Sequence, residues 1–482
     1  MSSSMSVDGL VSGLSTSSLI DSLMQVESAP QAALQQKVAN QSKVVSAYQA
    51  INSKMAALVT AAKALGGTDI WGAMKATSTS DAAVATSSSG AATGSLSFHV
   101  DSLAANHTVT FAGRVGATSA SIMSGSTLDV KLADGTSTTV TPTSGSLSDV
   151  VKSINGTTNA AYTASAVQVA PGQYTLQLTA KKSGAAESFS SPVAIDGLGA
   201  ETISSQGTDA QITVGTTTPY TVTSSTNTFA DVLPGVSITA VRKQAVGEAN
   251  AVVSVGADAD KVAASVKNLI DTANAALSEI SKQTVMNPAT ATGGKSTAGA
   301  LAGDFTMRTL EQNILDAVSG GAGALGSLRA VGIETTRDGQ LTFDQDKFKA
   351  AYTADAAKTQ SYFDSYTDVA HVNANAYDFD PGWDQANGIA RKLQTIGLRA
   401  TEGVRLPTNV TAKKEGLLQG LINRQNEYIG NLNDQVSEWD IRLDMRKTAL
   451  QKQFASLETA LSSMKNQSSW LAGQIAGLPT SG

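Results

Sequence analysis

Apolar residues recur at alternating steps of four and three near both ends of the chain. Such spacing is typical of a coiled coil, because only a repeat of about 3.5 residues keeps one stripe facing a partner helix. We therefore expect two long helices whose stripes pack on each other, on copies of the same chain or on a larger assembly. The N-terminal seam consists of Leu34, Val38, Val45, Tyr48, Met55 and Val59, and the C-terminal seam of Ile429, Leu432, Val436, Trp439, Leu443, Leu450, Phe454, Leu457, Leu461 and Met464.

A proline divides the N-terminal helical region. A short helix is expected to start near Ser17, and Leu19, Ile20 and Leu23 contribute to its apolar face. Pro30 disfavours a helix interior but suits a first turn, so it predicts the end of this helix and the start of the next. The second helix is expected to run to Leu65, where Gly66-Gly67 stop it. At 1.5 Å per residue, its length is roughly 54 Å.

The seams contain irregular positions. Gln41 and Asn52 interrupt the N-terminal seam. They are either tolerated polar positions beside better apolar residues, or polar residues that set the register and the number of partner helices. In the C-terminal seam, four-four spacing replaces four-three between Leu443 and Phe454, which predicts a local unwinding of the supercoil. We therefore expect an imperfect pairing within the chain, with further partners beyond it.

The pattern changes to short alternating runs between about residues 76 and 258. Period-two alternation predicts strands at 95–100, 107–111 and 127–132, and two later runs lie at 209–215 and 235–241. Asp134-Gly135 and Pro171-Gly172 are turn pairs that predict hairpins. One helix is expected at 147–155, capped by Ser146 or Ser148.

Helical patterns return after residue 258. Helices are predicted at 258–285 and 304–318, and a hairpin turning at Asp338-Gly339 precedes a helix capped by Asp344. From Gly388 the chain is expected to be helical to its end, apart from a break near Leu406-Pro407. Residues 366–387 are aromatic and polar, and no element is assigned to them.

This order predicts an α+β multidomain fold in which helical domains enclose inserted antiparallel β-rich head domains. Helix-forming segments from both ends must then build shared domains. We expect a terminal coiled-coil leg domain (1–47 plus 425–482), a mixed, mainly helical domain (48–76 plus 259–424), a β domain (77–112 plus 204–258) and an outer β-rich head domain (113–203).

Composition narrows the class of function. The chain has 482 residues, a net charge of −6 and 5% aromatic residues. An acidic balance argues against a nucleic-acid partner. No run reaches the roughly 20 apolar residues of a membrane span. The N-terminus lacks the basic and apolar regions of a secretory signal peptide, so no cleaved signal is expected.

The sequence contains few residues of the types that usually form catalytic or metal sites. Cysteine is absent, which excludes disulfides and thiol catalysis. The three histidines, His99, His107 and His371, are too scattered to predict a metal site or a triad. The segment 293–297 (GGKST) resembles the end of a phosphate-binding loop, but the preceding pattern is wrong. We expect no enzyme activity, no cofactor and no bound metal.

Five stretches resemble one family in the same order along the chain. The opening stretch (6–34) resembles the first signature of bacterial flagellar filament-capping proteins, the hook-associated protein 2 family, and the closing stretch (451–475) resembles its last signature. Residues 147–185 resemble the flagellin-hook IN motif. Residues 209–241 and 328–348 also match the family pattern. The resemblance covers nearly the whole chain.

The resemblance implies a homo-oligomeric cap at the extracellular tip of the flagellum. Such a cap promotes insertion of flagellin and prevents its loss, and its subunits leave by the flagellar type III route. It also implies partners: copies of the chain, flagellin with the filament tip, and an export chaperone. Helical legs would contact the filament, and the residues expected there are Leu10, Leu14, Leu19, Ile20, Leu23, Trp470 and Leu471.

Two alternatives stay open at this point. Hook–filament junction proteins and flagellins share helical termini, so the chain could be another axial structural protein. The β head could also act as an adhesin for cell surfaces or glycans. Residues 366–387 and 393–416 depart from the family pattern. Both stretches belong to the mixed helical domain, so its local architecture does not follow from the resemblance.

Overall fold

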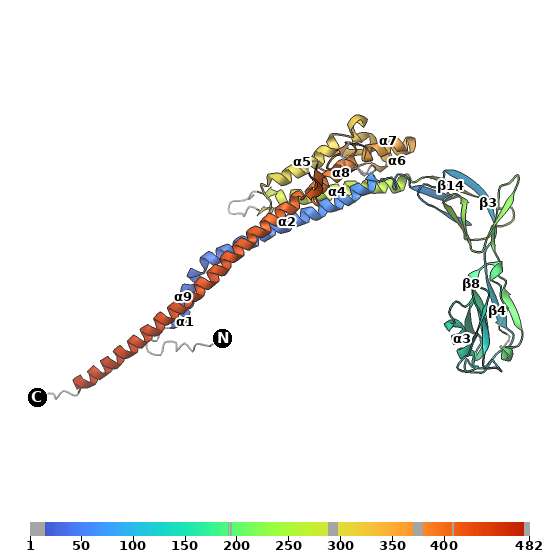
Figure 1. The fold of residues 1–482 in the computed structure, drawn as a ribbon, viewed down its shortest axis with the longest axis horizontal. Coiled ribbons are helices and arrows are strands. Elements are labelled where there is room, and N and C mark those ends of the chain that lie inside the picture. Colours follow the sequence, from blue (N-terminus) through green and yellow to red (C-terminus); the bar gives the residue numbers. More distant parts are fainter. Residues whose placement is uncertain are drawn as a thin grey trace. The chain divides into compact units, whose positions relative to one another are not determined.

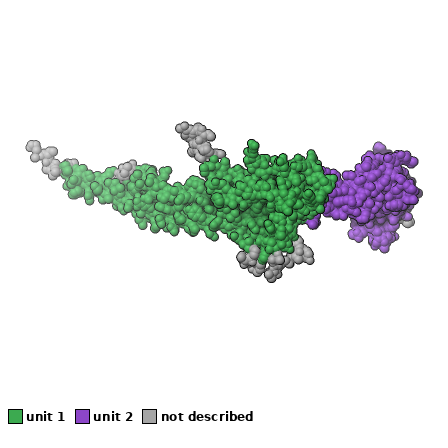
Figure 2. All heavy atoms as spheres, turned by 90° about the horizontal axis from the view of Figure 1, so that it is seen from above, with its two compact units in different colours: residues 1–67, 263–482 green, residues 68–262 purple. Residues whose placement is uncertain are grey.

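A computed structural model describes residues 15–190, 192, 195–287, 297–369, 379–406 and 409–476. The chain forms two compact units, shown in green and purple in Figure 2. Unit 1 contains residues 1–67 and 263–482, and unit 2 contains residues 68–262. Helices dominate the first unit and antiparallel sheets the second, which confirms the predicted α+β fold with a β-rich insertion.

Long helices form unit 1 (Figure 1). The predicted division at Pro30 is confirmed, because α1 ends at Glu27 and α2 begins at Ala29. Ser28, between them, has helical backbone angles, so the chain continues its course with only a local interruption. The helices are α1 (Thr16–Glu27), α2 (Ala29–Gly66), α4 (Ala259–Thr284), α5 (Phe305–Ser319), α6 (Gln345–Ala354), α7 (Ala356–Asp364), α8 (Ile389–Ala400) and α9 (Leu417–Ala476).

Side-chain caps explain where two of these helices start. The Asp304 carboxylate accepts hydrogen bonds from the backbone of Thr306 and Met307 at the start of α5. Asp344 does the same for α6, which confirms its predicted role as a cap. The predicted hairpin before α6 is also confirmed, since β17 (Ile333–Thr335) pairs with β18 (Leu341–Phe343). Gly339 adopts φ +73° in its turn.

A second hairpin corrects the prediction for the region after Gly388. We expected helix to the end with a simple break, but β21 (Val404–Leu406) and β22 (Asn409–Lys414) pair between α8 and α9. Gly403, just before this hairpin, has φ +81°. This left-handed conformation favours glycine and is not compatible with a continuing α-helix. Further two-residue pairs are β15 (Met286–Asn287) with β16 (Thr297–Ala298), and β19 (Tyr366–Thr367) with β20 (Gln385–Ala386).

The first core of unit 2 lies between two sheets. Their strand orders are β1-β14-β3-β10-β11 and β12-β13-β2. Buried residues such as Phe98, Ile212 and Ile238 join both sheets in one cluster. The strands are β1 (Met74–Ser78), β2 (Ala83–Ser87), β3 (Gly94–Ser102), β10 (Ala210–Val214), β11 (Tyr220–Ser224), β12 (Thr228–Leu233), β13 (Val236–Ala240) and β14 (Ala251–Ala257).

The second core of unit 2 forms around α3 (Leu147–Gly156) and a four-stranded sheet. Ser146 caps α3, as one of the two predicted alternatives. The sheet order is β7-β8-β4-β9, and a separate hairpin joins β5 to β6. Both predicted turns are confirmed, with Gly135 at φ +85° and Gly172 at φ +69°. The strands are β4 (Asn106–Phe111), β5 (Leu128–Lys131), β6 (Ser137–Val140), β7 (Tyr162–Ala170), β8 (Gln173–Ser183) and β9 (Glu201–Ser205).

The predicted four-part division of the chain stays a prediction. Strand pairing adds detail to it, because β4 and β9 lie side by side in the sheet of the second core. The expected head segment 113–203 omits β4. Val109 and Phe111 of that strand are buried with Leu147 of α3 in the second core.

Candidate functional site: the terminal helices

The three terminal helices lie against one another within unit 1. Helix α9 contacts both α2 and α1, and Figure 1 shows it continuing past the start of α1. The helices therefore bring residues from the two ends of the sequence together. The predicted contact residues that the structure describes can be placed on this arrangement by their burial.

Burial of the N-terminal seam increases along α2. Leu34 and Val38 are half-buried, whereas Val45, Tyr48, Met55 and Val59 are buried. The later part of α2 also contacts α8, whose residue Gly397 lies close to the Val59 side chain. A Cβ added at Gly397 would be 2.4 Å from Val59 Cγ2, so only glycine permits this approach.

The C-terminal seam lies along α9 with uneven burial. Leu432 and Leu450 are buried. Leu457 and Met464 are exposed, although they belong to the predicted seam. The remaining seam residues are half-buried: Ile429, Val436, Trp439, Leu443, Phe454 and Leu461.

Helix α9 changes partner where its seam changes step. Gln31 of α2 donates a hydrogen bond to the Asp440 carboxylate, and its amide lies 3.5 Å from the Val436 carbonyl oxygen. Farther along, the Arg446 guanidinium lies 3.3 Å from the Glu27 carboxylate of α1. A charged pair thus occupies the interval between Leu443 and Leu450, where α2 gives way to α1. The change of partner coincides with the change of seam spacing, and the predicted local unwinding of the supercoil stays a prediction.

Helix α1 is amphipathic but only partly covered. Ile20 is buried, whereas Leu19 and Leu23 are exposed. Val26 is 74% exposed and continues the four-three spacing of those two leucines. Leu10 and Leu14, also expected to make contacts, lie outside the described residues. An apolar stripe of α1 therefore faces away from the helices that bury Ile20.

The end of α9 also exposes apolar side chains. Trp470 is 66% exposed, and Leu471 and Ile475 are exposed as well. Seam reasoning missed Ile475, Ile441 and Met445, which are exposed on α9 outside the four-three series. Ile441 and Met445 could have been identified from the sequence, because they are apolar residues next to the seam positions but outside the four-three series.

A hydrogen bond joins the seam to the helical body. Tyr48 Oη donates to Asp304 Oδ2 at 2.6 Å, while the other carboxylate oxygen of Asp304 caps α5. Burial and the neighbouring carboxylate raise the pKa of Tyr48 well above its usual range. Sequence spacing assigned Tyr48 to the seam but could not find its partner, which lies 256 positions away.

Two described aromatic residues of the stretch 366–387 lie close to one arginine of α8, and residues 370–378 of that stretch lie outside the described residues. The Arg391 guanidinium lies 4.8 Å from the Phe379 ring centroid and 5.5 Å from that of Tyr366. It also donates to the carbonyl of Gly66, the last residue of α2. Cation–π contacts and a hydrogen bond to a helix C-terminus both favour a guanidinium here. Arg391 therefore links Tyr366 and Phe379 to the last residue of α2.

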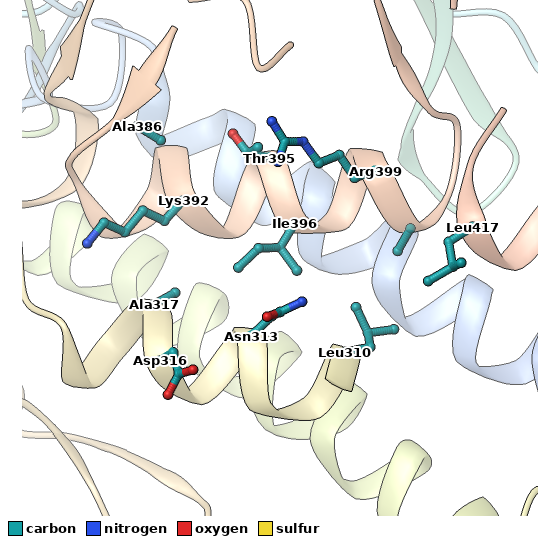
Figure 3. A pocket seen from close by; sticks show the side chains of 11 residues that line it. Leu310, Asn313, Asp316, Ala317, Ala386, Lys392, Thr395, Ile396, Arg399 and Leu417 are labelled. Carbon is teal, nitrogen blue, oxygen red and sulfur yellow. The ribbon is translucent and has the colours of Figure 1, made fainter. Parts of the chain in front are cut away.

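A groove of about 550 Å³ lies between α5 and α8. In Figure 3, Ile396 projects from α8 toward α5, and Leu310 and Leu417 also line the space. Lys392 Nζ donates to the Gly321 carbonyl at 2.7 Å, and burial lowers the pKa of this lysine. Six of the eleven lining residues are aliphatic, and the other five are polar or charged.

Ion-binding and membrane-spanning features are absent from the described part of the chain. No cluster of three or more acidic or histidine side chains there could hold a metal. No described helix has the length and apolar run required to cross a membrane.

The fold and these surfaces define an α+β structural protein whose paired terminal helices leave apolar stripes uncovered. Two family models match the chain: flagellar hook-associated protein 2 N-terminus over residues 12–107, and flagellar hook-associated protein 2 C-terminus over residues 207–466. The second match alone covers more than half of the 482 residues. The chain belongs to the flagellar hook-associated protein 2 family.

Curated relatives agree with this assignment. Flagellar hook-associated protein 2 of Escherichia coli K12 is 25% identical, with 97% of each chain covered. The lateral flagellar hook-associated protein 2 of Vibrio parahaemolyticus is 25% identical over 53% of this chain, and that match spans half of the relative's length.

A solved structure has a similar fold. The crystal structure of the D1–D2–D3 domains of the flagellar cap protein FliD from Escherichia coli matches with a TM-score of 0.54 and 22% identity. The match covers 78% of this chain and 99% of that one. The likeness supports the α+β multidomain fold described above.

Proposed function

We propose that this chain is a subunit of the cap at the distal tip of a bacterial flagellar filament, where it promotes ordered insertion of flagellin. Membership of the hook-associated protein 2 family supports this function. The structural observation that supports it best is the apolar surface left uncovered on α1 and at the end of α9. Surfaces of this kind on a soluble protein are typical of interaction sites.

The proposed filament contact consists of two parts. The first is the exposed stripe of α1, formed by Leu19, Leu23 and Val26. The second is the end of α9, with Trp470 and Leu471. Leu10 and Leu14 belong to the same proposed surface, and buried Ile20 holds α1 against its neighbours. Many moderate apolar contacts, without a deep anchor, suit a cap that must release and rebind as each flagellin is added.

The proposed partners are copies of this chain, flagellin and the filament tip. We also propose an export chaperone and type III export before assembly, in line with the sequence expectation. The site requires no cofactor and no catalytic residue, because holding and releasing a protein surface needs only complementary contacts.

Complementation of a strain that lacks this protein tests the filament contact. The test variant carries Leu19→Asp and Leu23→Asp, which place two charges on the exposed stripe, and the control is Val169→Asp in unit 2. We expect the test variant to leave short filaments and to release flagellin monomers into the medium, because the cap no longer holds the tip. The control should restore filaments of normal length.

Size measurement separates a contact defect from a folding defect. The purified double variant should be folded and should oligomerise like the wild type, because both leucines are exposed in the single chain. Filaments of normal length in the strain with the double variant would contradict the proposed contact.

A further inference from the structure

Two turns of this chain share a local sequence pattern and the same backbone hydrogen bonds. In each, an Asp-Gly pair holds the third and fourth of five positions: 132–136 (LADGT) between β5 and β6, and 336–340 (TRDGQ) between β17 and β18. The first residue donates its backbone N–H to the carbonyl of the fifth at 2.8 Å in both turns. The glycine N–H donates to the carbonyl of the first residue, at 3.0 Å from Gly135 and 3.2 Å from Gly339. The two turns are therefore a matched pair within one chain.

The turns differ in what binds the aspartate carboxylate. Asp134 Oδ1 accepts from the backbone N–H of Thr136 at 2.9 Å and from its hydroxyl at 2.6 Å. These hydrogen bonds lower the pKa of Asp134, so its carboxyl group stays charged. In the other turn, Gln340 N donates to Thr336 Oγ1 at 3.1 Å instead. The exposed Asp338 carboxylate has no hydrogen-bond partner among the described residues.

Hydrogen bonds also hold the side chains of the other described Asp-Gly and Asn-Gly pairs. The Asp196 carboxylate accepts from a serine backbone N–H at 3.0 Å and from the hydroxyl of the same serine. Asn155 and Asn387 both donate their side-chain amides. A further Asp-Gly pair, residues 8–9, lies outside the described residues. Among the described pairs, Asp338 is the one with an unbound side chain.

An aspartate that precedes glycine can rearrange through its own backbone. The glycine N attacks Cγ of the protonated carboxyl group, so an N–Cγ bond forms and a Cγ–O bond breaks as water leaves with the amide proton. Water then opens the resulting succinimide ring. Opening at the original main-chain carbonyl leaves the chain running through Cγ, which is an isoaspartate, and the other opening restores aspartate. One water leaves and one enters, so no further reactant is needed.

The unbound carboxyl group of Asp338 favours this attack. At Asp134, two hydrogen bonds must break before Cγ can turn toward the glycine N, and the carboxyl group must gain a proton against its lowered pKa. At Asp338 the carboxyl group is free to turn. The contact that opposes the attack there is the bond of the turn itself, from Gly339 N to the Thr336 carbonyl.

The strands on either side of the turn 336–340 are firmly held. Leu341 is buried, and its backbone exchanges two hydrogen bonds with the side chain of Asn274 on α4, both at 2.8 Å. Ile333, in the opposite strand, is also buried. An isoaspartate adds one carbon to the main chain, and these contacts confine the change to the turn. The modified chain is therefore expected to stay folded.

We propose that Asp338 is a site of spontaneous isoaspartate formation in the folded chain, with Gly339 N as the attacking atom and water as the reactant that opens the ring. The turn 336–340 thereby accumulates a covalent change with age, whereas Thr136 protects the matching turn 132–136. This inference concerns the single chain and goes beyond the proposed function.

Ageing of the full chain in heavy-oxygen water tests the site. The folded protein is kept at neutral pH, digested and analysed by mass spectrometry with electron-transfer fragmentation, which distinguishes isoaspartate from aspartate. We expect isoaspartate with one heavy oxygen to form at Asp338 at least about tenfold faster than at Asp134, because two hydrogen bonds hold the second carboxylate. In denaturant the two rates should be similar, since neither turn is then formed.

Two reciprocal variants test the role of the hydroxyl. Gln340→Thr places at the second turn the residue that Thr136 supplies at the first, and it should slow the rearrangement of Asp338 by about fivefold. Thr136→Val removes the hydroxyl and should accelerate the rearrangement of Asp134 by a similar factor. Equal rates at both aspartates in the folded chain, or no isoaspartate at Asp338, overturn the proposal. A wild-type rate in Gln340→Thr also overturns it.

Discussion

Tyr48 and Asn52 lie one turn apart on α2, and their polar atoms meet different surroundings. Tyr48 Oη donates to Asp304, whereas Asn52 Oδ1 is buried without a hydrogen-bond partner among the described residues. An unpaired buried carbonyl lowers stability because it loses its hydration without compensation. The two interpretations of Asn52 from the sequence, a tolerated polar position or a residue that sets the register, both stay predictions.

Replacing this asparagine should stabilise the protein. We expect Asn52→Leu to raise the free energy of unfolding of unit 1 by about 1–2 kcal/mol, because a side chain of similar size would remove the unpaired oxygen. Denaturant titration followed by circular dichroism measures the change. Asn52→Asp is the matched control and should lower stability, since it buries a charge at the same place. A lower stability for Asn52→Leu would show that the oxygen has a partner in solution.

At the scale of elements, α1 is the terminal helix with the least support. Contacts with α9 and α2 involve one buried large apolar side chain, Ile20, and one ion pair, Glu27–Arg446. The pair is exposed and worth about 1 kcal/mol or less. Ile20 therefore carries most of the attachment of α1 to the other helices.

Truncation of Ile20 should release α1 without unfolding unit 1. We expect Ile20→Ala to cost about 2–4 kcal/mol locally and to increase amide hydrogen exchange throughout α1, while exchange in α2 from Val45 onward is unchanged. Leu19→Ala, at an exposed neighbouring position, should leave α1 exchange as in wild type. Equal protection in both variants would mean that other contacts hold α1.

Local sequence patterns predicted most helices and strands, but they did not predict contacts between residues far apart in the sequence. Helix caps and tight turns depend on adjacent residues, so the sequence was sufficient to predict them. Examples are the caps Asp304 and Asp344 and the turn glycines Gly135 and Gly172. The β21–β22 hairpin was missed because its strands are short and lie beside strong helical patterns. Arg391 could not be assigned to Gly66 or Phe379, because only the folded chain brings them together.

The same limit applies to the candidate surfaces. Seam spacing located the apolar residues of α1 and α9, but it could not separate buried Ile20 from exposed Leu23. Both fit an amphipathic helix, and only the position of the neighbouring helices decides which one is covered. Gln244 belongs to no periodic pattern, so the hydrogen bond that its side chain accepts from the Val100 backbone is visible only in the structure.

At the scale of the whole molecule, unit 2 is an insertion with its own cores. Two clusters of buried residues, one around Phe98 and one around Tyr162, lie entirely within residues 68–262. The insertion begins and ends in paired strands, since β1 lies antiparallel to β14 with Met74 opposite Ala257. An inserted domain with adjacent ends and its own core is expected to fold independently.

Isolated unit 2 should therefore be a folded protein. We expect residues 68–262, produced alone, to unfold in a cooperative transition with a near-ultraviolet circular dichroism signal from packed aromatic residues. Phe98→Ala serves as the control and should lower its stability by about 3–5 kcal/mol. A fragment without a cooperative transition would show that unit 2 depends on unit 1.

The pairing of β1 with β14 also determines how mechanical load passes through the chain. Both covalent connections of unit 2 leave from the same end of this strand pair. A force that drags unit 2 is therefore divided between two backbones pulled in the same direction. Because both strands are pulled in the same direction, neither slides past the other. The hydrogen bonds that join β1 to β14 therefore carry little shear. Tension that separated the two connections would instead open the pair one residue at a time.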